Sequence, residues 1–479
     1  MKNLLKILFG AFLYLYTQQI FAIERTPLFQ NPLKKLNILL IVTDDQGLQA
    51  GFLGTQGLYT PNIDKLAQNG MAFTKAFCTF SSCSPSRAGI LTGTFPHVNG
   101  ITTNVFEFFG ANPTEAWIKS SSALNNQFHV KDTISTLIEV LKNEGYFTGI
   151  SGKFHIAPHK KFPFDFWAKN ISEQNADEFF SKTSGKPFFF AFNSKKPHRP
   201  FVEAKDEAKV LAKLKEKKFQ VPSYLPNTPL MQKDWAEYLV AIEKADTEVA
   251  EILEILKKRK LDENTLIIFV GDNGSPFHRG KYTPYNLGNN CPLIFSGPGV
   301  QKNVVTNTLA SFADIMPTIL EMANIKVPKS VNGKSLKSII SGEATVPVHE
   351  FVVSETAFPR KNEPNYQARS LFDERFLYIR TNGKPRLKLN PADMYLEKGW
   401  NNHSYQATIE AKNEFPLQYK LLEMLENSTN IEELFDLHSD PWCMIDISKN
   451  PDYVNVLNKL RKNLDTWISE TNDLEMLKN

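Results

Sequence analysis

Two pairs of adjacent polar residues carry the first chemical signal in this chain. Asp44-Asp45 and Asp272-Asn273 each follow directly after an apolar stretch. Carboxylates in such places are costly unless they are paired or bind a metal ion. Three carboxylates and one amide oxygen are the hard ligands of Ca²⁺ or Mg²⁺, and the sequence lacks the histidine and thiolate pattern of structural zinc. Asp44-Asp45 alone is equally well explained by a helix cap or a turn, but together the pairs indicate a divalent cation site.

A second group of residues could supply a nucleophile and proton transfer. Cys83 opens the segment CSPSRAGILTG, and Arg87 shares its face if this segment is helical. An imidazole suits general acid catalysis because its ordinary pKa lies near neutrality. Taken alone, a cysteine beside a proline is an ordinary loop residue, and Lys-x-His is more often a solvated loop than a site. The candidate lysines and histidines are Lys153, His155, Lys196, His198 and Lys281; His278 and Arg279 compete with Lys281, and the spacing does not decide between them.

Apolar runs of strand length alternate with helical patterns over the first two thirds of the chain, which predicts an α/β sandwich around a large, mostly parallel central sheet. The polar clusters at 44–45, 153–155, 196–198 and 272–273 all follow predicted strands, and open α/β sheets build their sites at the carboxyl ends of strands. The predicted strands are 37–42, 73–80, 146–150, 187–192, 265–271 and 292–296, and the predicted helices are 61–67, 133–143, 235–259 and 314–323.

The pattern changes near residue 346. Short strands are predicted at 351–355 and 376–380 and a terminal helix at 451–469, with an irregular segment at 385–428 between them. We therefore expect a catalytic domain over 23–345 and a smaller C-terminal α+β domain over 346–479, with a small antiparallel sheet.

Residues 1–22 have the features of an export signal: Lys2 and Lys6, then an apolar run at 7–16, then a cleavage site after Ala22. The run is too short for a good membrane span, although an uncleaved anchor is the alternative. We expect an exported protein, periplasmic or secreted, with no stable membrane insertion.

Composition excludes other classes. The net charge is only +4, which does not indicate nucleic-acid binding. The four cysteines (Cys78, Cys83, Cys291 and Cys443) are too few for the disulfide framework of a small exported domain. We expect them to be mostly buried, and a Cys78–Cys83 disulfide would remove the proposed nucleophile.

The extended Cys83 segment resembles the signature of the formylglycine-dependent sulfatases, and further blocks extend the resemblance from Asn37 to about Asp473. The resemblance implies an alkaline-phosphatase-like sandwich. It also implies that a maturation enzyme oxidises Cys83 to formylglycine, whose hydrate attacks sulfur. One divalent cation, usually calcium with magnesium as the alternative, would be bound by Asp44, Asp45, residue 83, Asp272 and Asn273.

The same resemblance assigns roles to the remaining candidates. Arg87 would hold the aldehyde hydrate, Lys153 would bind a sulfate oxygen, and His155 would take the hydrate proton when sulfate leaves. His198 would protonate the leaving group. Lys281 would contact the sulfate, and Lys196 and His97 are weaker candidates for substrate binding.

Several blocks are similar to the sulfamidase (N-sulfoglucosamine sulfohydrolase) branch, including His97-Val98-Asn99-Gly100. Lys196, however, stands where that branch has an acidic residue and matches the iduronate-2-sulfatases, so O- or N-sulfate is left open. We expect a bacterial enzyme that desulfates a polysaccharide such as algal ulvan or a glycosaminoglycan. Phosphonate or phosphate monoester hydrolysis and catalytically silent glycan binding are the alternatives. The segments 106–109 and 385–403, with Trp117, are either sugar-facing or ordinary core.

Overall fold

The computed structural model describes residues 35–105, 128–344, 346–358, 366–383, 403–427 and 430–477. The predicted signal peptide, residues 1–22, lies outside the described residues. Leu36–Asn479 forms one compact unit. Within the described residues, no helix combines the length and the apolar character needed to cross a bilayer.

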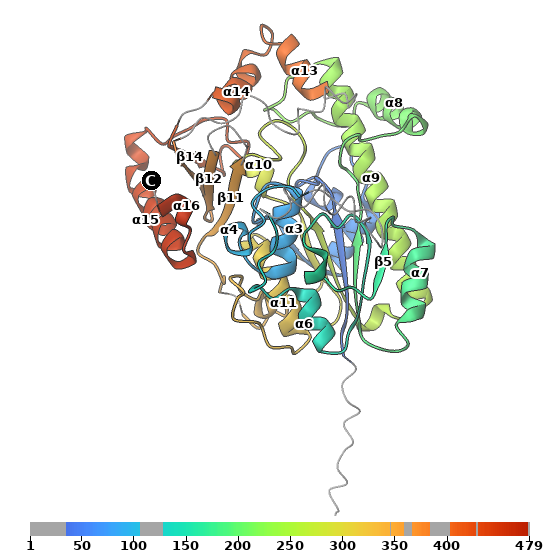
Figure 1. Ribbon diagram of the computed structural model, residues 1–479. Coiled ribbons are helices and arrows are strands. Elements are labelled where there is room, and N and C mark those ends of the chain that lie inside the picture. Colours follow the sequence, from blue (N-terminus) through green and yellow to red (C-terminus); the bar gives the residue numbers. More distant parts are fainter. Residues whose placement is uncertain are drawn as a thin grey trace, which may run out of the picture. The chain divides into compact units, whose positions relative to one another are not determined.

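An eight-stranded sheet forms the centre of this unit (Figure 1). β8 runs antiparallel to its neighbours β7 and β2, and the other neighbouring strands are parallel. The predicted α/β architecture with a large, mostly parallel sheet is therefore confirmed. The spatial order is β5 (Phe166–Ala168), β4 (Phe147–Gly152), β6 (Phe188–Asn193), β1 (Asn37–Thr43), β7 (Thr265–Gly271), β8 (Leu293–Ser296), β2 (Gly70–Phe73) and β9 (Val304–Thr306).

Helices cover both faces of this sheet because its central strands are apolar on both sides. In β1, Ile38, Leu40 and Val42 pack in the same hydrophobic cluster as residues of α3 (Cys83–Thr92), α6 (Leu137–Asn143) and α11 (Ile315–Met322). Leu39 and Ile41 point to the other face and pack with residues of α2 (Pro61–Gln68), α7 (Glu173–Lys182) and α9 (Pro229–Lys258). This alternation is the period of two expected for a strand buried on both faces.

The strand order explains why distant polar clusters meet. β4, β6, β1 and β7 are consecutive neighbours in the sheet and run parallel to one another. Their carboxyl ends therefore lie along one edge, where each of the four predicted polar clusters follows its strand. Two backbone hydrogen bonds join three of these loops: Asp272 N donates to Thr43 O, and Asp44 N donates to Lys196 O, both at 2.9 Å.

A smaller antiparallel sheet follows, as predicted for the C-terminal part. It consists of β11 (Val352–Phe358), β12 (Tyr366–Phe372), β13 (Phe376–Thr381) and β14 (Glu432–Asp436). Residues of α15 (Val454–Thr471) pack with this sheet in one hydrophobic cluster. The Phe77 ring of β3 (Ala76–Phe77) stacks on Phe372 at 4.0 Å, which joins the sheet to the larger part. The boundary at residue 346 stays a prediction.

Part of the sequence prediction for this region is wrong. The segment 385–428 was expected to be irregular, but it contains α13 (His403–Glu410) and α14 (Pro416–Asn427). β12 and β14 were not predicted as strands. β12 carries the buried Arg369 at its centre, which interrupts the apolar signal, and β14 has acidic residues at both ends.

The remaining described helices and short strands complete the connections. They are α4 (Pro96–Asn99), α8 (Glu207–Glu216), α10 (Asn286–Asn289), β10 (Ala310–Ser311), α12 (Lys337–Ile340) and α16 (Leu474–Leu477), with short 3₁₀ turns between some of them. All four cysteines are buried and free, so the expectation of no disulfide framework is confirmed.

Candidate active site

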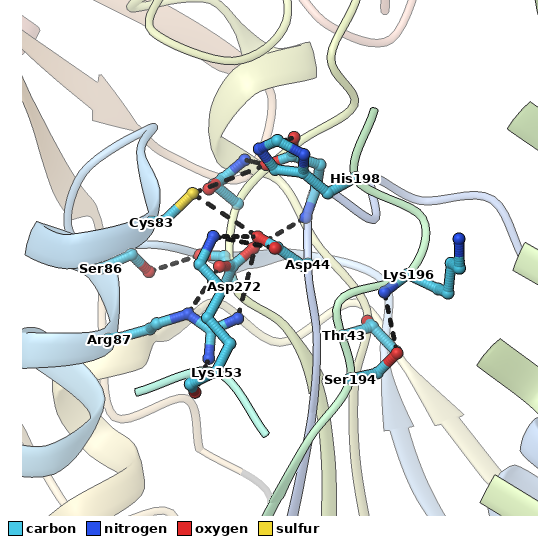
Figure 2. A network of polar contacts seen from close by, with 12 residues as sticks. Thr43, Asp44, Cys83, Ser86, Arg87, Lys153, Ser194, Lys196, His198 and Asp272 are labelled. Carbon is cyan, nitrogen blue, oxygen red and sulfur yellow. Dashed lines mark hydrogen bonds and ion pairs between the residues drawn. The ribbon is translucent and has the colours of Figure 1, made fainter. Parts of the chain in front are cut away.

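Cys83 and the predicted acidic residues lie together in the described structure (Figure 2). The Cys83 thiol donates to Asp44 Oδ1 at 3.5 Å and lies 3.8 Å from Asp45 Oδ1. Ligand atoms of Asp44, Cys83 and Asp272 all lie within 4.8 Å of one another, and all three residues are buried. Residues far apart in sequence therefore form one polar centre at the edge of the sheet.

Three cations surround these carboxylates. Lys153 Nζ donates to Asp44 Oδ1 and Oδ2 at 3.0 and 2.8 Å. Arg87 Nε donates to Asp272 Oδ2 at 2.8 Å, and Lys281 Nζ lies 2.6 Å from Asp45 Oδ1. Three negative and three positive side chains balance one another, as buried charges require.

The pKa values of Asp44 and Asp272 shift in opposite directions. Burial opposes ionisation of Asp44, but Lys153, His198 and Arg87 outweigh it and hold the pKa of that carboxyl well below its usual range. Burial raises the pKa of Asp272 to about 6, with Arg87 opposing and the charge of Asp44 adding to the rise. Burial and the neighbouring carboxylates therefore raise the pKa of Asp272, whereas the nearby cations keep that of Asp44 low.

The unmodified thiol is not an activated nucleophile here. Burial raises the pKa of the Cys83 thiol, although Lys153 and Lys281 partly oppose the rise. A protonated thiol attacks poorly, because the thiolate is the reactive form. The surroundings of Cys83 are thus unlike those of a cysteine that reacts as a thiolate.

The donor set fits a hard divalent cation. Asn273 Nδ2 donates to Asp45 Oδ1 at 3.0 Å and to Gly274 O at 2.9 Å, which leaves Asn273 Oδ1 buried without a partner among the described residues. Carboxylate oxygens of Asp44 and Asp272 lie within 4.8 Å of each other, and Asp45 joins them through its backbone N–H, which donates to Asp272 Oδ1 at 2.9 Å. Oxygen donors of this kind suit Ca²⁺ or Mg²⁺ rather than a softer metal.

Two histidines stand beside the charged centre with their pKa values lowered. Burial, with Lys153 and Arg87, lowers the pKa of His155 well below its usual range, which leaves a neutral imidazole able to accept a proton. Burial also lowers the pKa of His198, although Asp45 opposes this. His198 Nε2 lies 3.7 Å from Asp45 Oδ2, and its side chain keeps 20% of its surface exposed. His198 is therefore placed where the centre meets solvent.

The helix α3 fixes Cys83 and Arg87, and its sequence fits its packing. Cys83 is its first residue, and Ser86 Oγ donates to Asp272 O at 2.5 Å. A Cβ at Gly89 would lie 2.2 Å from Thr79 Oγ1, so only glycine allows this approach. Gly93 ends the helix with φ near 65°, a conformation that glycine adopts without strain.

Lys196 and His97 are not brought to this centre. Figure 2 shows the Lys196 side chain pointing away from Cys83, and the charges that act on it come from Lys244, Glu203 and Glu248. His97 Nδ1 lies 2.6 Å from Glu355 Oε1, and Nε2 lies 3.1 Å from Thr471 O. The geometry gives their predicted substrate-binding roles no support, and those roles stay predictions.

Other residues around the centre were missed from sequence. Asn104 Oδ1 accepts from Ser82 Oγ at 2.9 Å and from Ser84 N at 3.0 Å, so it holds both neighbours of Cys83. Asn104 Nδ2 also bonds to the hydroxyl of Tyr282. A lone asparagine on a loop gives no sequence signal, since its partners are set only by the fold.

A second group of side chains of metal-ligand type was also missed from sequence. Ligand atoms of Asp234, Glu237 and His403 lie within 4.8 Å of one another. The carboxylate of Asp234 is already held by Arg199, whose Nη1 and Nη2 donate to it at 2.7 and 2.6 Å. Because Arg199 follows His198, this buried pair anchors the loop that carries the candidate general acid. The predicted sugar-facing elements are 106–109, Trp117 and 385–403, and all of them except His403 lie outside the described residues.

Comparison with known proteins agrees with the site. The family model described as "Sulfatase" matches residues 36–325, and the chain belongs to the sulfatase family. This confirms the resemblance seen in the sequence and makes sulfuric ester hydrolysis the activity of the class.

The individual relatives have low sequence identity to this chain, but the alignments cover most of it. An ulvan-active sulfatase of Formosa agariphila is 27% identical, over 91% of this chain and 75% of its own. The N-sulphoglucosamine sulphohydrolase of Homo sapiens is also 27% identical, over 91% of this chain and 90% of its own. The solved structure of a 2-O glycosaminoglycan sulfatase has a TM-score of 0.64 at 19% identity, covering 92% of this chain and 93% of that one, and supports the fold alone.

Proposed function

We propose that this protein hydrolyses sulfate esters of a sulfated polysaccharide or its oligosaccharides. The observation that carries the proposal is the convergence of Asp44, Cys83 and Asp272, with Asn273 Oδ1 unsatisfied, among three buried cations. Such a centre can bind a metal ion and a sulfate group together.

Two groups would complete the centre. Asp44, Asp45, Asp272 and Asn273 would hold Ca²⁺, with Mg²⁺ as the alternative, and residue 83 would join them after oxidation to formylglycine by a maturation enzyme. The cation supplies polarisation of the sulfate oxygens and lessens their repulsion of an incoming nucleophile. The hydrated aldehyde supplies the attacking hydroxyl, which a buried, protonated thiol cannot.

The chain's own residues would then position the sulfate and move protons. Lys153 and Lys281 approach from within the charged centre and would neutralise sulfate oxygens, while Arg87 would orient the side chain at position 83. Neutral His155 would accept the proton of the second hydroxyl when sulfate leaves. His198, at the solvent side, would donate a proton to the leaving oxygen or nitrogen.

The substrate class rests on the relatives. They include an ulvan-active sulfatase and an N-sulphoglucosamine sulphohydrolase, so a sulfated glycan is the best candidate, with both O- and N-sulfates included. We also propose export through residues 1–22, to the periplasm or beyond, with the catalytic part at 23–345 and a C-terminal part at 346–479.

Paired substrates test this function against the phosphonate or phosphate alternative. The protein is coexpressed with a formylglycine-generating enzyme, loaded with Ca²⁺, and assayed on matched aryl sulfate, aryl phosphate and aryl phosphonate esters. We expect sulfate release to have the highest kcat/KM, and a panel of sulfated ulvan and glycosaminoglycan oligosaccharides then identifies the glycan. Higher kcat/KM for phosphate or phosphonate would overturn the proposal, and no turnover by the matured protein would favour a silent glycan-binding role.

A further inference from the structure

A pocket of about 480 Å³ lies next to the loops that carry the charged centre. Two of its lining residues, Gly47 and Ser275, stand two positions after Asp45 and Asn273. Two residues of chain span about 7 Å at most, so the pocket and the centre share the loops that follow β1 and β7. The volume falls within the range of about 300 to 1,000 Å³ that is typical of small-ligand sites.

The pocket has an exposed rim and a buried floor. Gln56, Gln220 and Ser223 at the rim are exposed, whereas Trp235 and Ser275 are buried. Solvent and ligands can therefore reach the rim, while a ligand that enters loses much of its contact with water.

Its chemistry is opposite to that of the charged centre. None of the lining residues that the structure describes carries a charge. The lining combines amide side chains and two indole rings with leucine and proline residues, so a sulfate or carboxylate would give up its hydration without meeting a cation. A neutral polyhydroxyl ligand would gain hydrogen bonds to amides and contact with indole faces. The residues concerned are Gln49, Gln56, Gln220, Asn286, Trp235 and Trp442.

Three lining residues also carry buried polar atoms without partners among the described residues. These atoms are Trp235 Nε1, Asn286 Oδ1 and Asn290 Oδ1. The amide nitrogens are already engaged: Asn286 Nδ2 donates to Pro441 O at 3.1 Å, and Asn290 Nδ2 donates to Thr74 O at 3.2 Å. One donor and two acceptors remain in the wall around the pocket, and buried groups of this kind are normally satisfied by ordered water. Because these atoms have almost no accessible surface, hydrogen bonds to a sugar would come instead from the exposed amides of Gln56 and Gln220.

We propose that this pocket binds an uncharged sugar residue and so provides a neutral glycan subsite distinct from the sulfate-binding centre. The identification of the ligand as part of the glycan substrate rests on the proposed function. Binding itself does not, because it involves no turnover and no formylglycine.

The test measures binding of neutral disaccharides to the full exported chain. Cellobiose, xylobiose and N,N′-diacetylchitobiose are titrated by ligand-observed NMR, with and without inorganic sulfate to occupy the charged centre. We expect a millimolar Kd for at least one disaccharide, unchanged by sulfate. Trp442→Ala and the rim variant Gln56→Ala/Gln220→Ala should each weaken it about tenfold, which corresponds to about 1.4 kcal/mol. Gln406→Ala, an exposed glutamine on α13 outside the pocket, serves as the matched control.

Different results would overturn the binding inference and the proposed function. Failure of all three disaccharides to bind, or equal binding by wild type and both pocket variants, would mean a pocket filled by water only and would overturn the inference. The rim variant keeps this decision available if Trp442→Ala does not fold. Sulfate release from a short aryl sulfate is measured on the same preparations and should be unchanged in the pocket variants. Its absence from the wild type would reject the proposed function without changing the binding result.

Discussion

Two buried charge clusters in this protein look alike but are built differently. The active-site cluster, which is the charged centre of the candidate active site, joins Asp44, Asp45 and Asp272 to Arg87, Lys153 and Lys281. The junction cluster lies where the small sheet meets α4 and α16 and consists of His97, Glu355, Arg369 and Asp473. In each, an aspartate that is 0% exposed accepts from an arginine Nε: Asp272 from Arg87 at 2.8 Å, and Asp473 from Arg369 at 2.6 Å.

The two clusters differ in whether their buried polar atoms have hydrogen-bond partners. At the junction, Arg369 Nη2 also donates to Asp473 Oδ1 at 3.0 Å, and both ring nitrogens of His97 face acceptors. In the active-site cluster, Asn273 Oδ1 has no partner among the described residues, and Asp272 is crowded by other carboxylates. A cluster that is complete in the protein alone stabilises the fold, whereas an incomplete one is suited to binding a ligand.

The largest effect on activity is expected when Cys83, beside the active-site cluster, is replaced. Cys83→Ala should lower sulfate release about ten-thousandfold or more, because alanine lacks the thiol group that must be oxidised to give the aldehyde and its nucleophilic hydrate. Folding should be retained, as measured by circular dichroism and thermal melting. Cys443→Ala, at another buried free cysteine, is the matched control and should keep its turnover. Appreciable sulfate release by Cys83→Ala would contradict the mechanism.

His198→Ala should separate substrates by leaving group. Loss of a general acid should lower kcat about 10²- to 10⁴-fold on glycan sulfates, since a sugar alkoxide is a poor leaving group. Activated aryl sulfates, which leave without a proton, should lose much less. Steady-state kinetics on both substrate types measure this, and equal losses would argue against the assigned role.

Substitution of one aspartate in each cluster, Asp473 or Asp272, tests the comparison through the free energy of unfolding. Asp473→Asn should lower the free energy of unfolding by about 3–5 kcal/mol, because it breaks a buried pair and leaves Arg369 and its neighbours uncompensated. Asp272→Asn should cost much less in chelator, since burial and Asp44 already disfavour the charge there, but it should abolish stabilisation by Ca²⁺.

Urea unfolding with and without Ca²⁺ gives both values for the aspartate pair. A large loss for Asp272→Asn in chelator, together with a small one for Asp473→Asn, would reverse the comparison. The wild-type protein in chelator provides the common reference.

His97 should give the smallest effect, and one that depends on pH. Burial lowers its pKa, but Glu355 outweighs burial, so the folded pKa is raised. The protonated ring therefore stabilises the fold fully below its unfolded pKa of about 6.5, and this contribution is lost as pH rises through the higher folded value. The stability difference between wild type and His97→Gln should shrink above about pH 6.5 in urea titrations. A difference independent of pH would show that the ring is not charged in this cluster.

The large sheet could be predicted because its signal is local. Strands such as β1 and β7 are continuous apolar runs that end in polar residues, and α6 begins at the Thr136 capping box. The small sheet was harder to predict, since β12 contains Arg369. The partner of Arg369 is Asp473, which is too distant in the chain to be recognised from the residues around β12.

The residues of the candidate site also divide into those whose position could be predicted from the sequence and those whose position could not. Asp44, Asp45, Asp272, Asn273 and Cys83 stand at strand or helix ends, so their types and positions already indicated one shared centre. Lys196 stands two residues from His198, and nothing in the sequence indicated that its side chain points away from Cys83 (Figure 2).

The amino-acid sequence was enough to identify the sulfatase family and the alternation of strands and helices, because these depend on residue type and on short repeats along the chain. The contacts of the folded chain were needed to show that His97 belongs to the junction cluster, that Asn104 holds the residues beside Cys83, and that a neutral pocket adjoins a charged centre. These depend on contacts between residues distant in the chain, such as His97 with Glu355 and Asn104 with Tyr282, and the packing of the whole fold fixes which side chains meet.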